Sequence, residues 1–158
     1  DCVSDFADVR AGDHVLDLYG GVGLFALQLH ESVGAGGRID LVEGSKSATA
    51  DAAVNFAGKE NVKIYTGDVE KILPRFSRAD VVILDPPRDG AKKNVIESLV
   101  ACKPRAIVYV ACDPAALARD SALLRDANYT LEKVRAFDLF PMTHHIECVA
   151  LFTPTAVS

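Results

Sequence analysis

The sequence has no excess of positive charge, no long apolar run and no paired cysteine motif. Its 22 Asp and Glu outnumber its 17 Lys and Arg, for a formal net charge of −5, which argues against a domain that binds nucleic acid by charge alone. The longest apolar run, residues 106–112, is far too short to cross a bilayer, and we expect no secretory signal. The acidic excess is smaller in residues 80–158, with 9 basic and 10 acidic groups, so this half can present a local basic face.

The four cysteines form no Cys-x-x-Cys pair and no cluster with histidine of the kind that holds a metal. We therefore predict no metal site. Because disulfides are rare in the cytosol, we interpret these residues as free thiols of a cytoplasmic protein. They are Cys2, Cys102, Cys112 and Cys148.

The alternation of short β-rich runs with helical patterns predicts βαβ units and a mostly parallel sheet. The length of 158 residues suits one globular domain, and no repeat or linker divides it. Two consecutive strands, at residues 129–137 and 146–152, are expected to end the sheet as an antiparallel pair. The other expected strands span residues 14–18, 38–42, 62–65, 80–84 and 106–110, and the expected helices span residues 23–32, 46–57, 92–101 and 115–126.

The last of these helices is predicted from an apolar stripe at helical spacing. The stripe consists of Ala115, Leu117, Ala118, Ala122 and Leu124.

Polar side chains follow five successive strands, at the edge where open α/β sheets bind their ligands. Any one of them could be a helix cap or a turn residue. We do not expect all of them to be structural, and we predict a binding site at this edge. The residues are Asp17 and Tyr19, then Glu43, Asp68, Asp85 and Cys112.

The first of these turns reads Asp17-Leu-Tyr-Gly-Gly-Val-Gly-Leu24. Gly21 and Gly23 allow the backbone to turn sharply and to approach a ligand, with a helix N-terminus behind. Glu43, at the end of the next strand, suits the two hydroxyls of a ribose. The same spacing would serve NAD, but Asp17 would repel a pyrophosphate and suits a cationic amino-acid group. We therefore expect S-adenosylmethionine and not NAD.

The turn after the fourth strand reads Asp85-Pro-Pro-Arg-Asp-Gly90. Its two prolines restrict the backbone, so the Asp85 side chain is expected to point into the cleft. Enzymes that methylate exocyclic amino groups of bases share Asp-Pro-Pro, usually followed by an aromatic residue. Here Arg88 follows, with Lys92 and Lys93 just beyond. These basic side chains could contact phosphates or be solvated residues of a rigid turn.

Cys112 ends the fifth strand and precedes Asp113-Pro114, which is typical of an N-cap followed by proline at the first helical position. A helix N-terminus lowers the pKa of a thiol and favours a nucleophile, whereas the adjacent Asp113 carboxylate raises it. The alternative is a small buried apolar residue, which is our interpretation of the other three cysteines.

Glu147 opens the last apolar strand, where a carboxylate is costly to bury without a partner or a role. The adjacent His144 and His145 are interpreted as hydrogen-bonding residues that position a neighbour, not as metal ligands.

Taken together, these residues resemble the RNA 5-methyluridine methyltransferase family, which methylates uridine at C5 in tRNA or ribosomal RNA. The resemblance covers essentially the whole chain. Four signatures occur in order: Asp17-Leu-Tyr-Gly-Gly-Val-Gly23, Asp85-Pro-Pro-Arg-Asp-Gly90, Val110-Ala-Cys-Asp-Pro-Ala-Ala-Leu-Ala-Arg119 and Asp138-x-Phe-Pro-x-Thr-x-His-Ile-Glu147.

The resemblance implies an α/β class I S-adenosylmethionine-dependent methyltransferase (Rossmann-like) fold with an antiparallel C-terminal strand. It also implies that Cys112 is the nucleophile and Glu147 the base. Cofactor contacts are implied for Tyr19, Glu43 and Asp85, together with Asp68.

Some positions depart from the common family pattern. Ala111 and Asp113 stand where Ser and Asn are common, Gly20 where Cys is common, and Leu24 where many members have a polar cofactor contact. Because the positions of the nucleophile, the acid and the base are all kept, we expect these changes to modify the activity and not to abolish it. Full-length members also carry an N-terminal RNA-binding region, some with an iron–sulfur cluster. We expect residues 1–158 to be a single catalytic domain from the C-terminal part of a longer protein, monomeric and dependent on that region for RNA.

The expected reaction is methylation of uridine C5 through a covalent adduct of Cys112 at C6. C5 is too weak a nucleophile to take the methyl group directly, and thiolate addition makes it enolate-like. Asp85 would orient the base, and Glu147 would remove the C5 proton. Two alternatives stay open. One is a Rossmann-fold methyltransferase that acts on an exocyclic base amine and needs no Cys112, and the other is a cofactor-binding domain without turnover.

Overall fold

The computed structural model describes residues 1–139, 142 and 145–157. Seven strands form one sheet in the order β3-β2-β1-β4-β5-β7-β6. Strand β7 runs antiparallel to both of its neighbours, β5 and β6, whereas the other adjacent strands in this order are parallel, which confirms the predicted fold class. The strands are β1 (His14–Leu18), β2 (Arg38–Glu43), β3 (Val62–Thr66), β4 (Val81–Leu84), β5 (Ala106–Ala111), β6 (Tyr129–Asp138) and β7 (Ile146–Pro154).

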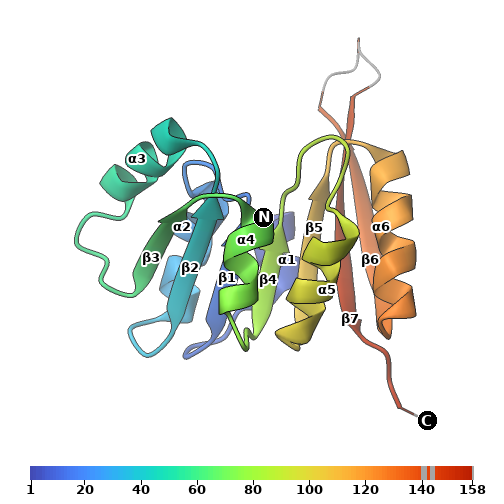
Figure 1. The fold of residues 1–158 in the computed structure, drawn as a ribbon, viewed down its shortest axis with the longest axis horizontal. Helices are drawn as coiled ribbons and strands as arrows, with labels where there is room; N and C mark the ends of the chain where they lie inside the picture. The colour runs from blue at the N-terminus through green and yellow to red at the C-terminus, as the bar shows by residue number, and fades with distance from the viewer. Residues whose placement is uncertain (140–141, 143–144, 158) are drawn as a thin grey trace.

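Helices cover both faces of the sheet (Figure 1), so β4 and β5 are buried from end to end and read as continuous apolar runs. One face packs on α1 (Cys2–Ala7), α2 (Leu24–Val33) and α3 (Lys46–Asn55). The other face packs on α4 (Val69–Ile72), the 3-10 turn η1 (Leu73–Arg75), α5 (Lys93–Ala101) and α6 (Pro114–Asp126). Within the described part of the chain, no helix is both long and apolar enough to span a membrane.

The short elements α1, α4 and η1 were not expected from the sequence, because they are too short to show a helical period. In α1 the Asp1 carboxylate accepts a hydrogen bond from the Val3 amide at 3.3 Å. Val3, Phe6 and Ala7 are buried against the sheet. Tertiary packing stabilises this turn of helix more than its own propensity does.

The prediction for the buried stripe of α6 was partly wrong. Ala115 and Ala118 are exposed, and the buried face consists of Ala116, Leu117, Asp120 and Leu124. Alanines on all sides of the helix gave no clear apolar direction. The side that packs on β5 and β6 therefore includes a carboxylate.

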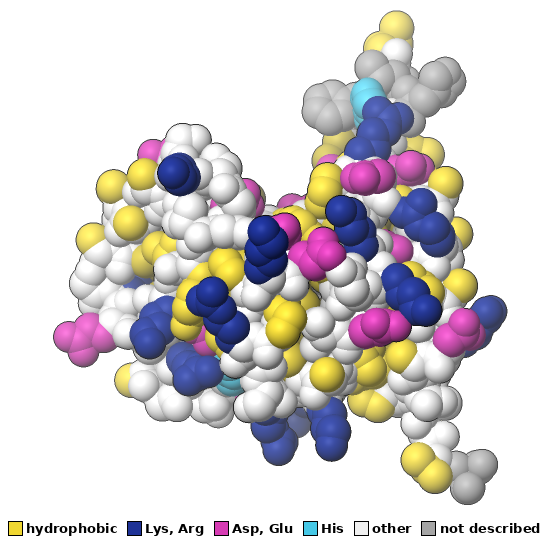
Figure 2. All heavy atoms as spheres, in the orientation of Figure 1, with side chains coloured by type: hydrophobic (Ala, Val, Ile, Leu, Met, Phe, Trp, Pro, Cys, Tyr) yellow, Lys and Arg dark blue, Asp and Glu magenta, His cyan; other side chains and the backbone are white. Residues whose placement is uncertain are grey.

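The carboxyl ends of the parallel strands meet at one edge of the sheet, at the top of Figure 1. The surface dips there between α3 and the β6–β7 hairpin, as Figure 2 shows. The predicted site residues follow these strand ends.

Candidate active site

Asp17, in β1, is a fully buried carboxylate beneath the glycine turn. Its Oδ2 accepts a hydrogen bond from the Ala26 amide of α2 at 3.2 Å, whereas Oδ1 has no hydrogen-bond partner among the described residues. Burial raises the pKa of Asp17 to about 7, and the neighbouring Asp85 and Glu43 carboxylates add to this shift. A buried carboxylate with an unused acceptor atom suits a bound cation.

The glycine turn is joined to Glu43 at the end of β2. Glu43 accepts a hydrogen bond from the Gly21 amide and another from the Ser45 amide, both at 2.9 Å. Each carboxylate oxygen retains a second lone pair for a hydroxyl donor. The glycines are also sterically required: Gly23 has φ +88°, and a Cβ there would lie 2.4 Å from the Phe56 ring.

Tyr19 and Asp68 lie close enough to interact electrostatically at the same edge. Burial raises the pKa of Tyr19 to about 12, with Asp68 as the next contribution. Tyr19 itself has a left-handed backbone, φ 58°. Asp68 caps α4, since its carboxylate accepts a hydrogen bond from the Glu70 amide at 3.0 Å. A capping role is therefore established for Asp68, and its cofactor role stays a prediction.

Asp85 follows β4 and is half-buried. Burial raises its pKa to about 6, and the Glu147 and Glu43 carboxylates contribute in that order. Its amide donates to the Leu18 carbonyl at 3.3 Å. Asp85 thus lies within electrostatic reach both of the cofactor candidates on β1 and β2 and of Glu147 on β7.

Cys112 and Glu147 are brought together by the antiparallel β5–β7 ladder. Ala111 and Cys148 form the last pair of this ladder, and Cys112 and Glu147 are the residues directly beyond this pair. Residues that face each other in such a ladder have Cα atoms about 4.5–5.5 Å apart. The two residues are 35 positions apart in the sequence, and pattern reasoning alone did not predict that they would be neighbours.

The Cys112 thiol is exposed, and α6 begins directly behind it. Asp113 caps this helix, accepting a hydrogen bond from the Ala115 amide at 3.0 Å, and Pro114 is its first residue. This arrangement confirms the predicted N-cap and proline. Glu147 is half-buried and lines a hollow of about 450 Å³ together with Phe25, Val110 and residues of α1.

The other cysteines lie in different surroundings. Cys102 and Cys148 are buried, and burial raises the pKa of both thiols, which makes them poor nucleophiles at neutral pH. Cys2 is half-buried in α1. The part of the fourth signature formed by Phe140, Pro141, Thr143 and His144 lies outside the described residues, and the positioning role of His145 stays a prediction.

With this geometry in place, the chain can be compared with known proteins. The family model for tRNA (uracil-5-)-methyltransferases matches residues 2–154. This chain belongs to the tRNA (uracil-5-)-methyltransferase family. The predicted family is thereby confirmed.

Members of the family with similar sequences are considerably longer. An uncharacterised RNA methyltransferase of Streptomyces avermitilis is 52% identical over 93% of this chain and 34% of its own length. The 23S rRNA (uracil(1939)-C(5))-methyltransferase RlmD of Shewanella sp. strain MR-4 is 41% identical over 94% of this chain and 33% of its own length. The chain thus spans about a third of these relatives.

A solved family member has the same fold. The Pyrococcus abyssi tRNA (uracil-54, C5)-methyltransferase, in complex with S-adenosyl-L-homocysteine, superposes with a TM-score of 0.79 at 29% identity. The match covers 96% of this chain and 37% of that one. S-adenosyl-L-homocysteine is the demethylated form of the cofactor expected from the sequence.

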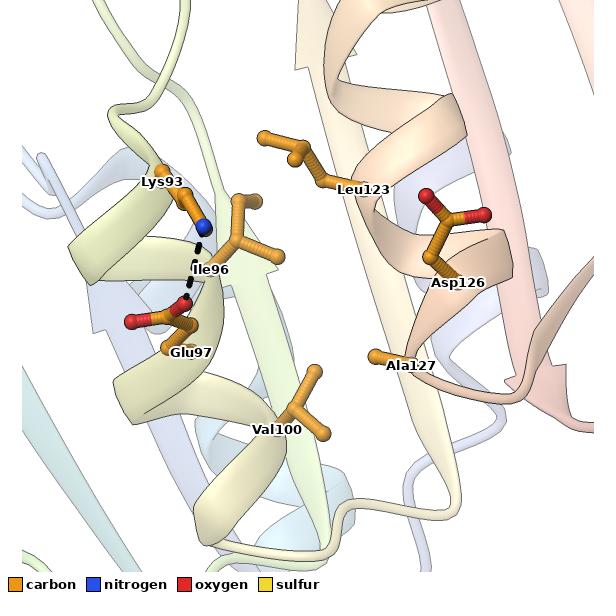
Figure 3. Close-up of a pocket in the computed structure, with 7 residues that line it drawn as sticks. All are labelled: Lys93, Ile96, Glu97, Val100, Leu123, Asp126 and Ala127. Carbon is orange, nitrogen blue, oxygen red and sulfur yellow. Dashed lines mark ion pairs between the residues drawn. The ribbon is translucent and has the colours of Figure 1, made fainter.

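The basic side chains after Asp85 are exposed at the surface of the chain. Lys92 pairs with Glu70 at 3.9 Å and Lys93 with Glu97 at 3.8 Å, but exposed pairs of this kind are weak. Figure 2 shows Lys and Arg interspersed with Asp and Glu over this face. In Figure 3, Lys93 and its partner Glu97 border a hollow of about 400 Å³ between α5 and α6. Phosphate contacts by Arg88, Lys92 and Lys93 stay predictions.

Two residues of the site region were missed by sequence reasoning. Phe56 packs where a side chain at Gly23 would stand. Asp120, on the buried face of α6, contacts the loop that follows Asp85. A signal for Asp120 was present, because it stands three residues after Leu117 and four before Leu124.

Proposed function

We propose that this chain is the catalytic domain of an S-adenosylmethionine-dependent RNA methyltransferase that acts on uridine C5 in tRNA or ribosomal RNA, in the cytoplasm. The observation that carries the proposal is that an exposed thiol, Cys112, and a carboxylate, Glu147, directly adjoin the last pair of the β5–β7 ladder, Ala111 with Cys148. Family membership and the solved relative with S-adenosyl-L-homocysteine support it.

The residues around the glycine turn would hold the cofactor. The unpartnered Oδ1 of Asp17 suits its ammonium group, and Glu43 suits the ribose hydroxyls. Gly21 and Gly23 allow close backbone approach, and Tyr19, Asp68 and Asp85 complete the edge of the site. When bound, S-adenosylmethionine would supply a methyl group on a positively charged sulfur; the methyl carbon is open to attack by a carbon nucleophile, and the sulfur would keep the electron pair of the bond that breaks.

Cys112 would begin the reaction on the uracil ring. Its thiolate sulfur forms a bond to C6, and the electron pair of the C5–C6 double bond becomes available at C5, which can then form a bond to the methyl carbon. Asp85, with a pKa of about 6, is largely ionised at neutral pH and can accept a hydrogen bond from the base.

Glu147 would complete the reaction. After methylation, C5 carries both the methyl group and its original proton. The Glu147 carboxylate removes that proton, the C5–C6 double bond re-forms, and the bond between C6 and the Cys112 sulfur breaks to release the thiolate. The target nucleotide must leave any base stack to reach these residues.

A covalent trap with RNA containing 5-fluorouridine tests this proposal in the complete protein. Fluorine at C5 cannot be removed as a proton, so a methylated adduct should persist on Cys112 and survive denaturing electrophoresis. Methyl transfer to RNA without any adduct would instead favour the exocyclic-amine alternative. Cofactor binding with neither adduct nor methyl transfer on tRNA and ribosomal RNA would favour a domain without turnover.

A further inference from the structure

A buried carboxylate on α6 joins the two segments that carry Asp85 and Cys112. Asp120 is fully buried, and its Oδ2 accepts two hydrogen bonds. The Tyr109 hydroxyl of β5 donates at 2.5 Å, and the Ala91 amide, in the loop after Asp85, donates at 2.8 Å. Three segments of the domain therefore meet at one oxygen atom.

The loop after Asp85 packs directly on this carboxylate. Gly90 has φ +82°, its amide donates to the Pro87 carbonyl at 2.8 Å, and a Cβ there would lie 2.7 Å from Oδ2 of Asp120. Arg119, the preceding residue on α6, donates a hydrogen bond to the carbonyl of Asp89. Two consecutive helix residues thus bind two backbone groups of the loop, the Asp89 carbonyl and the Ala91 amide.

Such a carboxylate is costly for the fold. Burying a charged group without full compensation destabilises a protein. Oδ1 of Asp120 has no hydrogen-bond partner among the described residues, although the Nε of Arg119 lies 3.8 Å from it as an ion pair. Burial, with the added effect of Asp120, raises the pKa of the Tyr109 hydroxyl, which therefore remains a donor. Charge-assisted bonds of this kind are strong and directional, and they fix the loop backbone more firmly than apolar contacts would.

We propose that Asp120 and Tyr109 are positioning residues that fix the Asp85 loop relative to the helix that begins behind Cys112. They act through Asp85, which orients the base, and neither residue touches the substrate. This inference rests on the proposed function, because a carboxylate and a thiol that act on one base must keep a constant separation. A displacement of about 1 Å in such an arrangement can cost about 100-fold in rate.

The test compares variants of the complete protein by the rate of adduct formation on 5-fluorouridine RNA and by S-adenosylmethionine affinity. Asp120→Leu removes the acceptor, Tyr109→Phe removes one donor, and Asp120→Asn keeps an oxygen that can accept both hydrogen bonds. Tyr129→Phe is the matched control, because the Tyr129 hydroxyl is also buried, donates to the Pro104 carbonyl at 2.8 Å and lies away from the loop.

In Asp120→Leu we expect the adduct rate to fall about tenfold or more, and in Tyr109→Phe about threefold to tenfold, with cofactor affinity changed less than about threefold. Asp120→Asn should recover most of the rate lost in Asp120→Leu. The control should stay within about twofold of the wild type, although it loses a similar amount of stability. This pattern separates positioning from a purely structural role.

An adduct rate in Asp120→Leu and Tyr109→Phe no lower than in Tyr129→Phe would overturn the inference. If Asp120→Leu does not fold, the adduct rates of Tyr109→Phe and Gly90→Ala test the inference instead. The Cβ added at Gly90 disturbs the contact between the loop and the Asp120 carboxylate from the loop side. Hydrogen exchange of the Ala91 amide gives a readout that does not need turnover. A wild type that forms no adduct contradicts the proposed function, whereas unchanged Ala91 exchange in Tyr109→Phe and Gly90→Ala contradicts the loop contact itself.

Discussion

Cys112 and Glu147 occupy the register positions next to the Ala111–Cys148 pair of the β5–β7 ladder. A sheet sets the spacing of residues that face each other across two strands more tightly than a loop does. The candidate nucleophile and the candidate base therefore both adjoin a paired position of the sheet, and Asp85 follows β4, the strand next to β5.

Replacing Glu147 by Gln should trap the reaction after methyl transfer. The amide keeps the size and shape of the side chain but cannot accept the C5 proton, so addition and methylation proceed while elimination stalls. Denaturing electrophoresis with ordinary uridine RNA should show a methylated RNA–protein band. The double variant Glu147→Gln/Cys112→Ala is the control and should show no band. A Glu147→Gln protein that turns over at the wild-type rate, without adduct, would return Glu147 to a structural role.

Replacing Cys112 by Ala should abolish methyl transfer. The side chain is exposed, so its loss should alter stability by less than about 0.5 kcal/mol and cofactor affinity by no more than a few-fold. Cys148→Ala and Cys102→Ala, which alter buried thiols, should keep activity in the fraction that folds. The measurement is transfer of labelled methyl groups to RNA by the complete protein. Turnover in Cys112→Ala would favour methylation of an exocyclic amine.

Affinity for S-adenosylmethionine should fall as the pH falls through about 7. In the free protein the Asp17 pKa is about 7, and a bound ammonium group requires the ionised carboxylate. Below this pKa, binding must first remove a proton from Asp17, so the dissociation constant rises by up to about tenfold per pH unit. Calorimetric titration between pH 5.5 and 8.5 measures this. Asp17→Asn should bind weakly and with a smaller pH dependence over this range, since Asp85, with a pKa of about 6, still titrates there. An equal pH dependence of the dissociation constant in both proteins would contradict the role of Asp17.

The stability of the cofactor-free protein should change with pH in the opposite sense. Because the folded-state pKa of Asp17 is raised from 3.8 to about 7, the folded state binds more protons than the unfolded state between these values. The free energy of unfolding therefore decreases as the pH rises from 4 to 7. Urea unfolding at pH 5 and at pH 8 measures this decrease in each protein. The decrease should be about 2–4 kcal/mol smaller in Asp17→Asn than in the wild type. An unchanged difference would show that Asp17 ionises normally.

Gly23→Ala should destabilise the domain by about 2 kcal/mol or more. The backbone there has φ +88°, and the new Cβ would lie 2.4 Å from the Phe56 ring. Gly36→Ala is the control, since no heavy atom lies within 4 Å of its added Cβ, and it should change stability by less than about 0.5 kcal/mol. The double variant Gly23→Ala/Phe56→Leu should recover the part of the lost stability that is due to the clash with the Phe56 ring. Equal effects of the two alanine substitutions would contradict this account.

Much of the fold could be predicted from the sequence, because buried parallel strands and their connecting helices alternate in a clear pattern. The polar site edge could also be predicted, since the carboxyl ends of parallel strands meet. The proximity of Cys112 and Glu147 to one strand pair could not be predicted, because it depends on the register of two strands with a helix and a further strand between them. The burial of Asp120 was not predicted, because alanines on all sides of α6 obscure the direction of its apolar face. Helix α1 depends on tertiary contacts, which a local sequence pattern does not contain.

The β-bulge near Leu131 and Lys133 lies in the edge strand β6 and leaves the pairing of β7 with β5 continuous. An insertion or deletion within β6 can therefore be accommodated at the edge of the sheet without a change in the β5–β7 register. A one-residue insertion in β7 between Cys148 and Phe152 would reverse the direction of Glu147, since successive side chains point to opposite faces. We infer that insertions and deletions are tolerated in β6 but excluded from this part of β7. Any redesign of the domain should keep that short segment at constant length.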